Sequence, residues 1–195
     1  MLVLASASPR RQELLRNAGI PFEVQPAHIP EDPQPGEGAK DCAERLACEK
    51  ASAIAKKRPN DAVLGADTVV VVDDQILGKP LDRADAARML RLLSGRTHQV
   101  ITGVCLVRPV PSTRNSAASE RVIVSSESTL VTVSELTDQE IAEYVASGEP
   151  MDKAGAYAIQ GIASRWIPRI EGDYCNVVGL PVARVCRMLR ELGVE

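Results

Sequence analysis

The stretch Ser6-Ala-Ser-Pro-Arg-Arg11, directly after a short apolar run, combines residue types that bind phosphate. Ser8 is a favoured helix N-cap and Pro9 a favoured first helical residue, so the stretch predicts a helix start. An arginine in the first helical turn is repelled by the positive end of the helix dipole, which costs roughly 0.3 to 1 kcal/mol of helix stability. A bound anion would remove that conflict, because backbone N–H groups, hydroxyls and guanidinium groups all hold phosphate. Arg10 and Arg11 therefore indicate an anion site, unless both point into solvent.

Asp67 is the second candidate, a carboxylate inside the apolar run of residues 62–72. Burial of a carboxylate without a partner is costly, so its position requires a physical reason. A carboxylate beside a magnesium ion can position and deprotonate an attacking water, as a general base or a metal ligand. Gly65 would allow the close backbone approach that such a site needs. The alternative is an aspartate that caps a turn, and both interpretations stay open.

Further candidates are three lysines, a glutamine and a glutamate. Lys50 lies on the apolar face of a predicted helix, where it either snorkels into solvent or points into a cleft as a functional cation. Lys79 lies in a Gly-Lys-Pro loop, and Lys153 and Gln160 lie in a glycine-rich segment. Solvated lysines and a turn-capping glutamine are the alternatives, and Glu31 in a proline-rich loop carries the weakest signal. The chain has no P-loop or dinucleotide-binding motif, so phosphate chemistry would need another scaffold.

Hydrophobic periodicity and turn residues predict the elements that must position these side chains. Helices are expected over residues 9–18, 39–57, 82–93, 137–146 and 182–192. Strands are expected over residues 2–5, 22–25, 62–72, 97–107, 121–133, 166–170 and 174–178. Residues 108–120 are predicted to form a mobile hairpin loop without a function of its own. The alternation predicts an α/β fold with a mixed sheet and helices on both sides.

Length and composition limit the function classes. The 195 residues fit a single domain, with or without two lobes. A net charge of −3 and few aromatic residues argue against nucleic acid or an anionic membrane as the main partner. The five cysteines and two histidines lack metal-binding spacing, so we expect reduced core thiols. Without a signal-peptide pattern or a membrane-length apolar run, a cytoplasmic protein is expected.

Six motifs in chain order together resemble the Maf family of nucleotide pyrophosphatases. They are Ser6-x-Ser-Pro-Arg-Arg-x-Glu-Leu-Leu15, Glu49-Lys-Ala51, Gly65-Ala-Asp-Thr-Val69, Gly78-Lys-Pro80, Leu93-Ser-Gly95 with Val100-x-Thr-Gly103, and Val178-Gly-Leu-Pro181. The resemblance runs from residue 2 to about residue 190. It implies an inosine-triphosphatase-like architecture, in which an elongated mixed sheet is flanked by helices and two lobes surround a nucleotide cleft, often in a homodimer.

The resemblance also implies the activity: a nucleoside triphosphate is hydrolysed between its α and β phosphates, with Mg²⁺ or Mn²⁺, to the monophosphate and pyrophosphate. Asp67 matches the family's catalytic base and Glu31 matches an acidic residue at a metal contact, so Asp67 and Glu31 are the expected metal ligands. The residues that match or are expected to form the substrate site are Ser8, Arg10, Arg11, Lys50, Thr68, Lys79, Lys153 and Gln160. Clearance of noncanonical or excess nucleotides is the implied role.

Residues 152–161 resemble the branch of the family that prefers dTTP and UTP. Arg10, Thr68 and Gln160 correspond to specificity positions of that branch. The Gln160 amide suits this role, because it can donate to and accept from a pyrimidine edge. The chain departs from the family pattern in two places. Pro30 precedes Glu31 where relatives often carry an acid, and residues 108–120 have no clear counterpart.

The main alternative function is a noncatalytic regulator of cell division that binds nucleotide as a signal. The family name reflects an association with blocked division, which keeps this alternative open. The combination of Asp67 with Arg10, Arg11 and Lys79 favours the enzyme, because a scaffold needs no carboxylate base beside several cations.

Overall fold

A computed structural model describes residues 1–110 and 119–194, with the side chains of Val110 and Ser119 left out. The chain divides into two compact units, and each is assembled from separate segments. Unit 1 comprises Met1–Asp67, Thr102–Glu127 and Gly179–Glu195, and unit 2 comprises Thr68–Ile101 and Ser128–Val178. No helix in the described ranges is long and apolar enough to cross a membrane.

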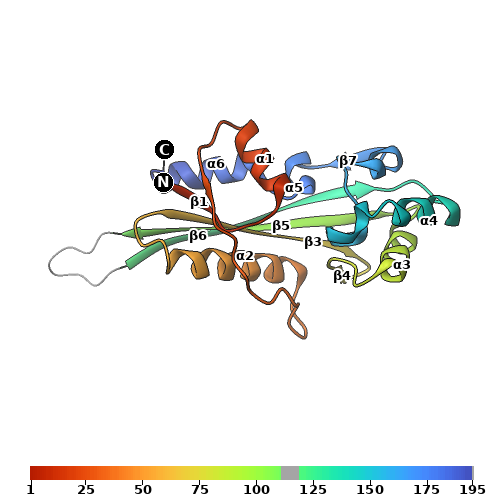
Figure 1. Cartoon of the computed structure of the whole chain (residues 1–195), viewed down its shortest axis with the longest axis horizontal. Helices are drawn as coiled ribbons and strands as arrows, with labels where there is room; N and C mark the ends of the chain where they lie inside the picture. The colour runs from red at the N-terminus through yellow and green to blue at the C-terminus, as the bar shows by residue number, and fades with distance from the viewer. Residues whose placement is uncertain (111–118, 195) are drawn as a thin grey trace. The chain divides into compact units, whose positions relative to one another are not determined.

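Figure 1 labels the α-helices and most of the strands named here. The strands are β1 (Leu2–Leu4), β2 (Glu23–Val24), β3 (Ala62–Val72), β4 (Gln75–Leu77), β5 (Thr97–Val110), β6 (Ser119–Thr132) and β7 (Arg169–Glu171). The α-helices are α1 (Pro9–Asn17), α2 (Ala39–Ala55), α3 (Arg83–Leu93), α4 (Asp138–Ala146), α5 (Tyr174–Val178) and α6 (Val182–Glu191). Three 3-10 helices are η1 (Glu149–Asp152), η2 (Ala154–Ala156) and η3 (Ile162–Trp166).

The described strands form one seven-stranded sheet in the order β2-β1-β3-β5-β6-β7, with β4 paired to β3. β1 runs parallel to β2 and β3, whereas β4 is antiparallel to β3 and β7 is antiparallel to β6. The predicted α/β fold with a mixed sheet flanked by helices is confirmed.

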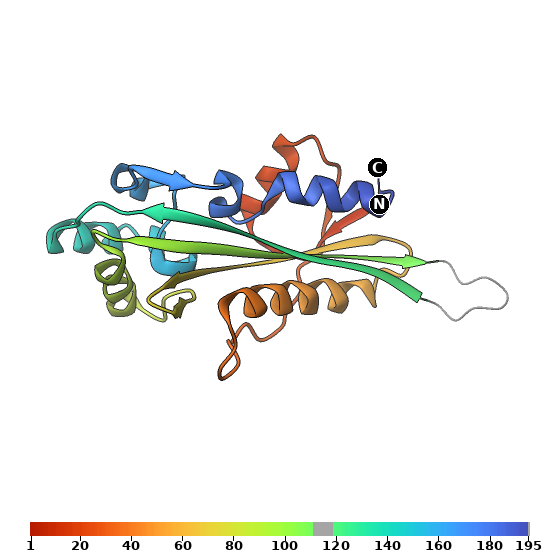
Figure 2. The same cartoon turned by 180° about the vertical axis from the view of Figure 1, so that it is seen from behind.

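In unit 1 the two faces of the sheet are covered by different helices, as Figures 1 and 2 show from opposite sides. Successive side chains of a strand point to opposite faces. On β3, Ala62, Leu64 and Ala66 pack in one core with residues of α1 and α6. Val63 packs in a second core with residues of α2. The odd-numbered residues of this part of β3, Asp67 included, therefore belong to the face that α2 covers.

Two glycines let α2 lie unusually close to the sheet. A Cβ at Gly65 of β3 would lie 2.0 Å from the backbone oxygen of Ala47, and a Cβ at Gly103 of β5 would lie 2.3 Å from that of Ala43. Real side chains do not reach such distances, so only glycine fits at either position while the helix keeps its place. The close approach that Gly65 predicted is confirmed, and the backbone that approaches is that of α2.

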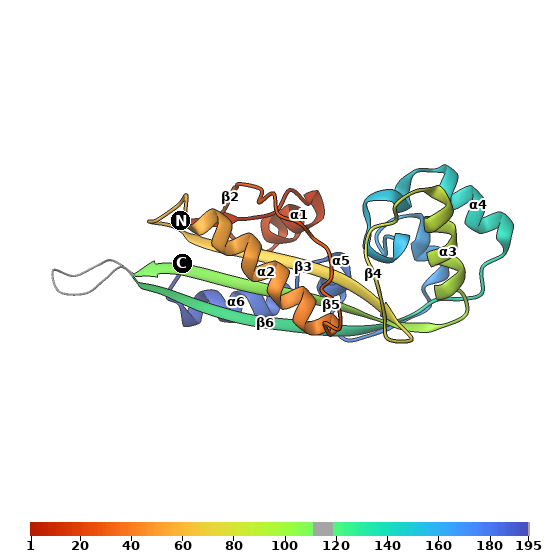
Figure 3. The same ribbon diagram turned by 90° about the horizontal axis from the view of Figure 1, so that it is seen from below.

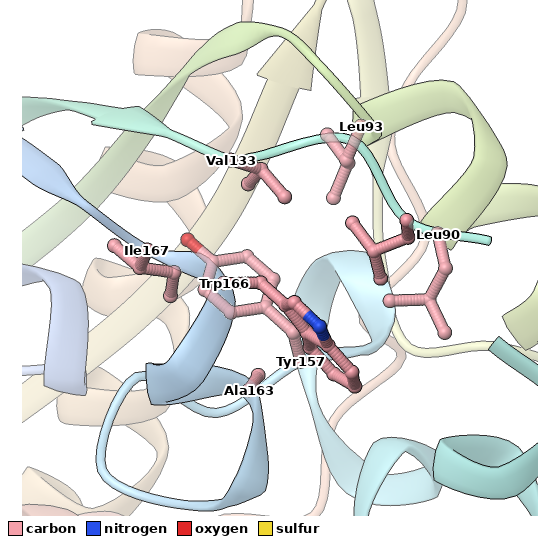
Figure 4. A pocket seen from close by; sticks show the side chains of 8 residues that line it. Leu90, Leu93, Val133, Tyr157, Ala163, Trp166 and Ile167 are labelled. Carbon is pink, nitrogen blue, oxygen red and sulfur yellow. The ribbon is translucent and has the colours of Figure 1, made fainter. Parts of the chain in front are cut away.

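Unit 2 has a core of its own, in which α3 and α4 lie beside each other (Figure 3). Asp82 caps α3, and Thr137 and Glu140 form the predicted capping box of α4. Figure 4 shows apolar side chains of this core around Tyr157 and Trp166. The cavity between them measures about 10 Å³, roughly the space of one water molecule. It is therefore a packing gap of the core and too small for a nucleotide.

Several predicted elements were wrong. Residues 174–178 form helix α5 instead of a strand, because the Asp173 carboxylate accepts hydrogen bonds from the backbone N–H groups of Cys175 and Asn176. Trp166 ends η3 instead of starting a strand. Strand β4 was missed: Asp73 and Asp74 both have positive φ and turn the chain directly into it. Of the predicted loop 108–120, residues 108–110 and 119–120 belong to strands, and residues 111–118 lie outside the described residues.

Candidate active site

The start of α1 presents one buried arginine. Ser8 and Pro9 occupy the predicted N-cap and first helical positions, although the Ser8 side chain makes no capping hydrogen bond. Arg11 is only 9% exposed. Its Nε donates to the Gly179 carbonyl at 2.8 Å and its Nη1 to Ser6 Oγ at 3.1 Å. Arg11 therefore does not point into solvent, and these contacts tie it to the segment that precedes α6.

Charged neighbours define the setting of Arg11. Burial lowers the pKa of Arg11, the carboxylates of Asp67 and Glu31 raise it, and the half-buried Arg10 lowers it. A guanidinium is not deprotonated in proteins, so Arg11 stays charged at neutral pH despite this lowering. Arg11 is thus a fixed positive charge near two carboxylates.

Asp67 lies within β3 and is 8% exposed. Its Oδ1 lies 2.6 Å from Nζ of Lys50, which is 5% exposed. The same ammonium lies 2.6 Å from Oε1 of Glu31. The turn-capping interpretation of Asp67 and the snorkelling interpretation of Lys50 are both wrong. One buried ammonium instead joins two carboxylates that are 36 residues apart in the chain.

The local packing of α2 explains this ion pair. Ala47 and Ala51 lie against Gly65, and Lys50 lies between them on the buried face of the helix. Asp67 follows Gly65 by two residues, so its side chain emerges on the same face of β3. Close packing at Gly65 therefore brings the ammonium to the carboxylate.

Arg45 holds the loop that carries Glu31. Its Nε and Nη2 donate to the two carboxylate oxygens of Glu37 at 2.6 and 2.8 Å, and Nη2 also donates to the Asp32 carbonyl at 3.2 Å. Hydrogen bonds from Arg45, and after them the one from the Gln34 backbone N–H, lower the pKa of Glu37 to about 2. Sequence reasoning missed Arg45. The only local signal was its spacing to Glu49, with which it forms an i,i+4 ion pair.

The remaining candidates belong to unit 2. Thr68 is half-buried in β3, while Lys79 and Gln160 are exposed. The loop of Lys79 meets the segment of Lys153 through a hydrogen bond from Gly155 N–H to the Gly78 carbonyl at 3.0 Å. Lys153 Nζ donates to the Glu149 carbonyl at 2.6 Å and pairs with Asp152. The structure thus groups Arg11, Glu31, Lys50 and Asp67 within unit 1, and the roles assigned to all the candidates stay predictions.

The five cysteines, all within the described residues, are free thiols, as expected. Cys42 and Cys105 are buried, and the other three are half-buried. Among the described residues no group of three or more His, Cys, Asp or Glu side chains is placed to hold a metal ion. Any metal bound by Asp67 and Glu31 would therefore have few ligands from the protein itself.

Comparison with known proteins places the chain in a family. The model of the family described as Maf-like protein matches residues 1–192. A dTTP/UTP pyrophosphatase of Koribacter versatilis is 60% identical over 193 residues, which cover 99% of this chain and 95% of the relative. Proteins of the same name from Symbiobacterium thermophilum and Bacillus anthracis are 50% and 45% identical, over 98% and 100% of this chain and 94% and 96% of their own lengths. With its motifs and the full-length match, this chain belongs to the Maf family.

Proposed function

We propose that this protein hydrolyses dTTP and UTP between the α and β phosphates, releasing the nucleoside monophosphate and pyrophosphate. The observation that carries the proposal is the buried Asp67 carboxylate, paired with Lys50 at 2.6 Å and near the fixed cation Arg11. A general base and neighbouring cations are the parts that this hydrolysis needs. Relatives at 45 to 60% identity that are named dTTP/UTP pyrophosphatase support the choice of substrates.

In this mechanism Asp67 accepts a proton from the water that attacks the α phosphorus. Lys50 orients the carboxylate through its 2.6 Å contact, and Ser6 and Gly179 orient Arg11. Arg10, Arg11, Lys50 and Lys79 neutralise the charge that develops on the pyrophosphate as the bond to the α phosphate breaks. The N-terminus of α1, with Ser8 at its N-cap, offers backbone N–H groups to the same phosphates.

Glu31 and Asp67, the two carboxylates that pair with Lys50, are the residues proposed as metal ligands. Glu31 Oε1 and Asp67 Oδ1 both lie 2.6 Å from one positive charge, and carboxylate oxygens are the ligands that Mg²⁺ prefers. We propose that Asp67 and Glu31 hold Mg²⁺ or Mn²⁺, with substrate phosphates and water as the other ligands. Such a cation would neutralise phosphate charge and lower the pKa of a bound water. Position 30 is a proline, so of positions 30 and 31 only Glu31 can offer a carboxylate.

The remaining assignments of the proposal concern recognition of the nucleotide base, and the location, assembly and role of the protein. Gln160, with Arg10 and Thr68, reads the pyrimidine, and Lys153 contributes to the substrate site. The protein acts in the cytoplasm as a homodimer, with no nucleic-acid or membrane partner, and removes noncanonical or excess nucleotides. These assignments follow from the family resemblance and from the composition of the chain.

The test is pyrophosphate release from a panel of nucleoside triphosphates, with and without Mg²⁺. Asp67→Asn should lower kcat about 100- to 10,000-fold, the usual contribution of a general base. Asp73→Asn is the matched control, because Asp73 is an exposed carboxylate directly after the same strand, and it should keep full activity. Undiminished release by Asp67→Asn would refute the mechanism. If the protein binds nucleotides but releases pyrophosphate from none of them, the noncatalytic regulator is favoured instead.

A further inference from the structure

The turn that carries Gln160 is held at both ends by two side chains of unit 2, Tyr144 and Glu149. The backbone N–H of Ala158 donates to the Tyr144 hydroxyl at 3.2 Å. The backbone N–H of Ile162 donates to the Glu149 carboxylate at 3.0 and 3.2 Å. The Tyr144 hydroxyl in turn donates to Glu149 Oε1 at 2.8 Å. One hydroxyl and one carboxylate therefore fix the backbone on each side of Gln160.

The turn also fits closely against Glu149. Gly161 N–H donates to the Ala158 carbonyl at 3.1 Å, which closes the turn around Gln160. A Cβ at Gly161 would lie 2.3 Å from Glu149 Oε1, so only glycine fits at that position while the carboxylate keeps its place. The backbone on either side of Gln160 is therefore fixed by both hydrogen bonding and shape.

The anchor of this arrangement is rigid. Tyr144 is 2% exposed, and its ring packs edge-on against Trp166 with ring centroids 5.4 Å apart. Burial and the hydrogen bond to Glu149 raise the pKa of Tyr144, so the hydroxyl stays protonated and can donate and accept at once. Phenylalanine would fill the same space in the core, and the hydroxyl is needed only for the contacts to Ala158 and Glu149.

We propose that Tyr144 and Glu149 are positioning residues that set base discrimination through Gln160. Uracil and thymine present an acceptor at O4 where cytosine presents an amino donor, so an amide held in one orientation can tell them apart. A mobile turn would not keep the Gln160 side chain at the base edge, and ordering the turn on binding would lower affinity. This inference rests on the proposed function, in which Gln160 reads the pyrimidine.

The experiment is a double-mutant cycle read out as the ratio of kcat/KM for dTTP over dCTP. Tyr144→Phe should lower this ratio about 10-fold, which corresponds to about 1.4 kcal/mol, mainly through a higher KM for dTTP. The double variant Tyr144→Phe/Gln160→Ala should have the same dTTP over dCTP ratio as Gln160→Ala alone. Tyr174→Phe is the matched control, because Tyr174 is an exposed tyrosine of the same unit, and its ratio should stay unchanged.

Glu149→Gln provides the second variant, with Glu143→Gln of α4 as its control. The amide nitrogen that replaces one carboxylate oxygen opposes the Ile162 N–H, so the dTTP over dCTP ratio should again fall. Amide hydrogen exchange should also speed up at Ala158 in Tyr144→Phe and at Ile162 in Glu149→Gln. Proportional losses for both nucleotides, or an undiminished Tyr144→Phe effect in the Gln160→Ala background, would overturn the inference.

The proposed function can fail separately from this inference. Absence of pyrophosphate release by the unmodified protein from every nucleotide would overturn the proposed function. The inference would then be tested by calorimetric binding of dTTP and dCTP to the same variants. An affinity ratio that falls in Tyr144→Phe only when Gln160 is present supports positioning, and an unchanged ratio overturns it.

Discussion

Lys50 neutralises two carboxylates within unit 1. Its buried ammonium faces Asp67 and Glu31 at 2.6 Å each. Lys50→Met should lower the free energy of unfolding by about 3 kcal/mol, because it leaves the Asp67 carboxylate buried without this partner. Urea denaturation at neutral pH measures the change, and Lys56→Met, an exposed lysine at the end of the same helix, is the control.

Combining Lys50→Met with Asp67→Asn should restore most of the lost stability, since the uncompensated charge is then gone. A Lys50→Met protein as stable as the unmodified one would show that the ion pair contributes little. In that case the cation is retained for catalysis alone.

His98 predicts how the stability of unit 2 depends on pH. Burial lowers the pKa of His98 from 6.5 to about 4, and its Nε2 lies 2.8 Å from the Tyr157 hydroxyl. As the pH falls below 6.5 the unfolded chain takes up a proton that the folded protein does not, so stability falls between pH 6.5 and 4. The full effect is about 3 kcal/mol.

Urea denaturation of His98→Gln across this pH range should show a shallower dependence on pH. His28→Gln, which alters a histidine that is not buried, should keep the slope of the unmodified protein. An unchanged slope in His98→Gln would contradict the predicted role.

At the scale of elements, the site depends on the distance between α2 and β3. Gly65→Ala would place a Cβ 2.0 Å from the Ala47 carbonyl oxygen, so the helix must move. We expect a loss of about 2 kcal/mol or more in unfolding free energy, together with loss of activity, because Lys50 moves with the helix. Gly78→Ala is the stability control, since no atom lies within 4 Å of a Cβ at that position and its φ is not positive. Equal melting temperatures for both variants would refute the packing argument.

Sequence patterns located most elements but not their partners. Residues 62–72 form a strand with the predicted bounds, and the capping box of Thr137 and Glu140 starts a helix where it was expected. The short segments were harder to assign. Residues 174–178 are β-branched and aromatic in part, yet the hydrogen bonds of Asp173 start a helix there. A run of five residues is too short for its hydrophobic periodicity to distinguish a strand from a helix, so the contacts of Asp173 decide.

At the scale of the molecule, unit 1 depends on both ends of the chain. Leu2 and Leu4 of β1 share one core with five buried side chains that follow residue 179, namely Leu180, Val185, Met188, Leu189 and Leu192. A chain that ends at Val178 should lose this core and the Gly179 contact of Arg11. At about 1.5 to 3 kcal/mol for each side chain, the loss reaches the usual total stability of a domain.

Circular dichroism of the 1–178 chain should therefore show no cooperative melting of unit 1. Arg187→Ala in the full chain is the control, because Arg187 is not buried on α6 and its loss should leave melting unchanged. A sharp transition near the original midpoint in the 1–178 chain would contradict this prediction.

The sequence by itself determined the α/β class, most helix and strand positions, and the residue types of the candidate site, because periodicity, caps and motifs are local properties of the chain. Only the tertiary structure decided that Lys50 pairs with Asp67, that Arg11 is buried, and that Arg45 and Tyr144 hold the segments of Glu31 and Gln160. These contacts join residues far apart in the chain. They depend on which face of β3 helix α2 covers and on its close packing at Gly65, and the sequence did not say which segment would pack there.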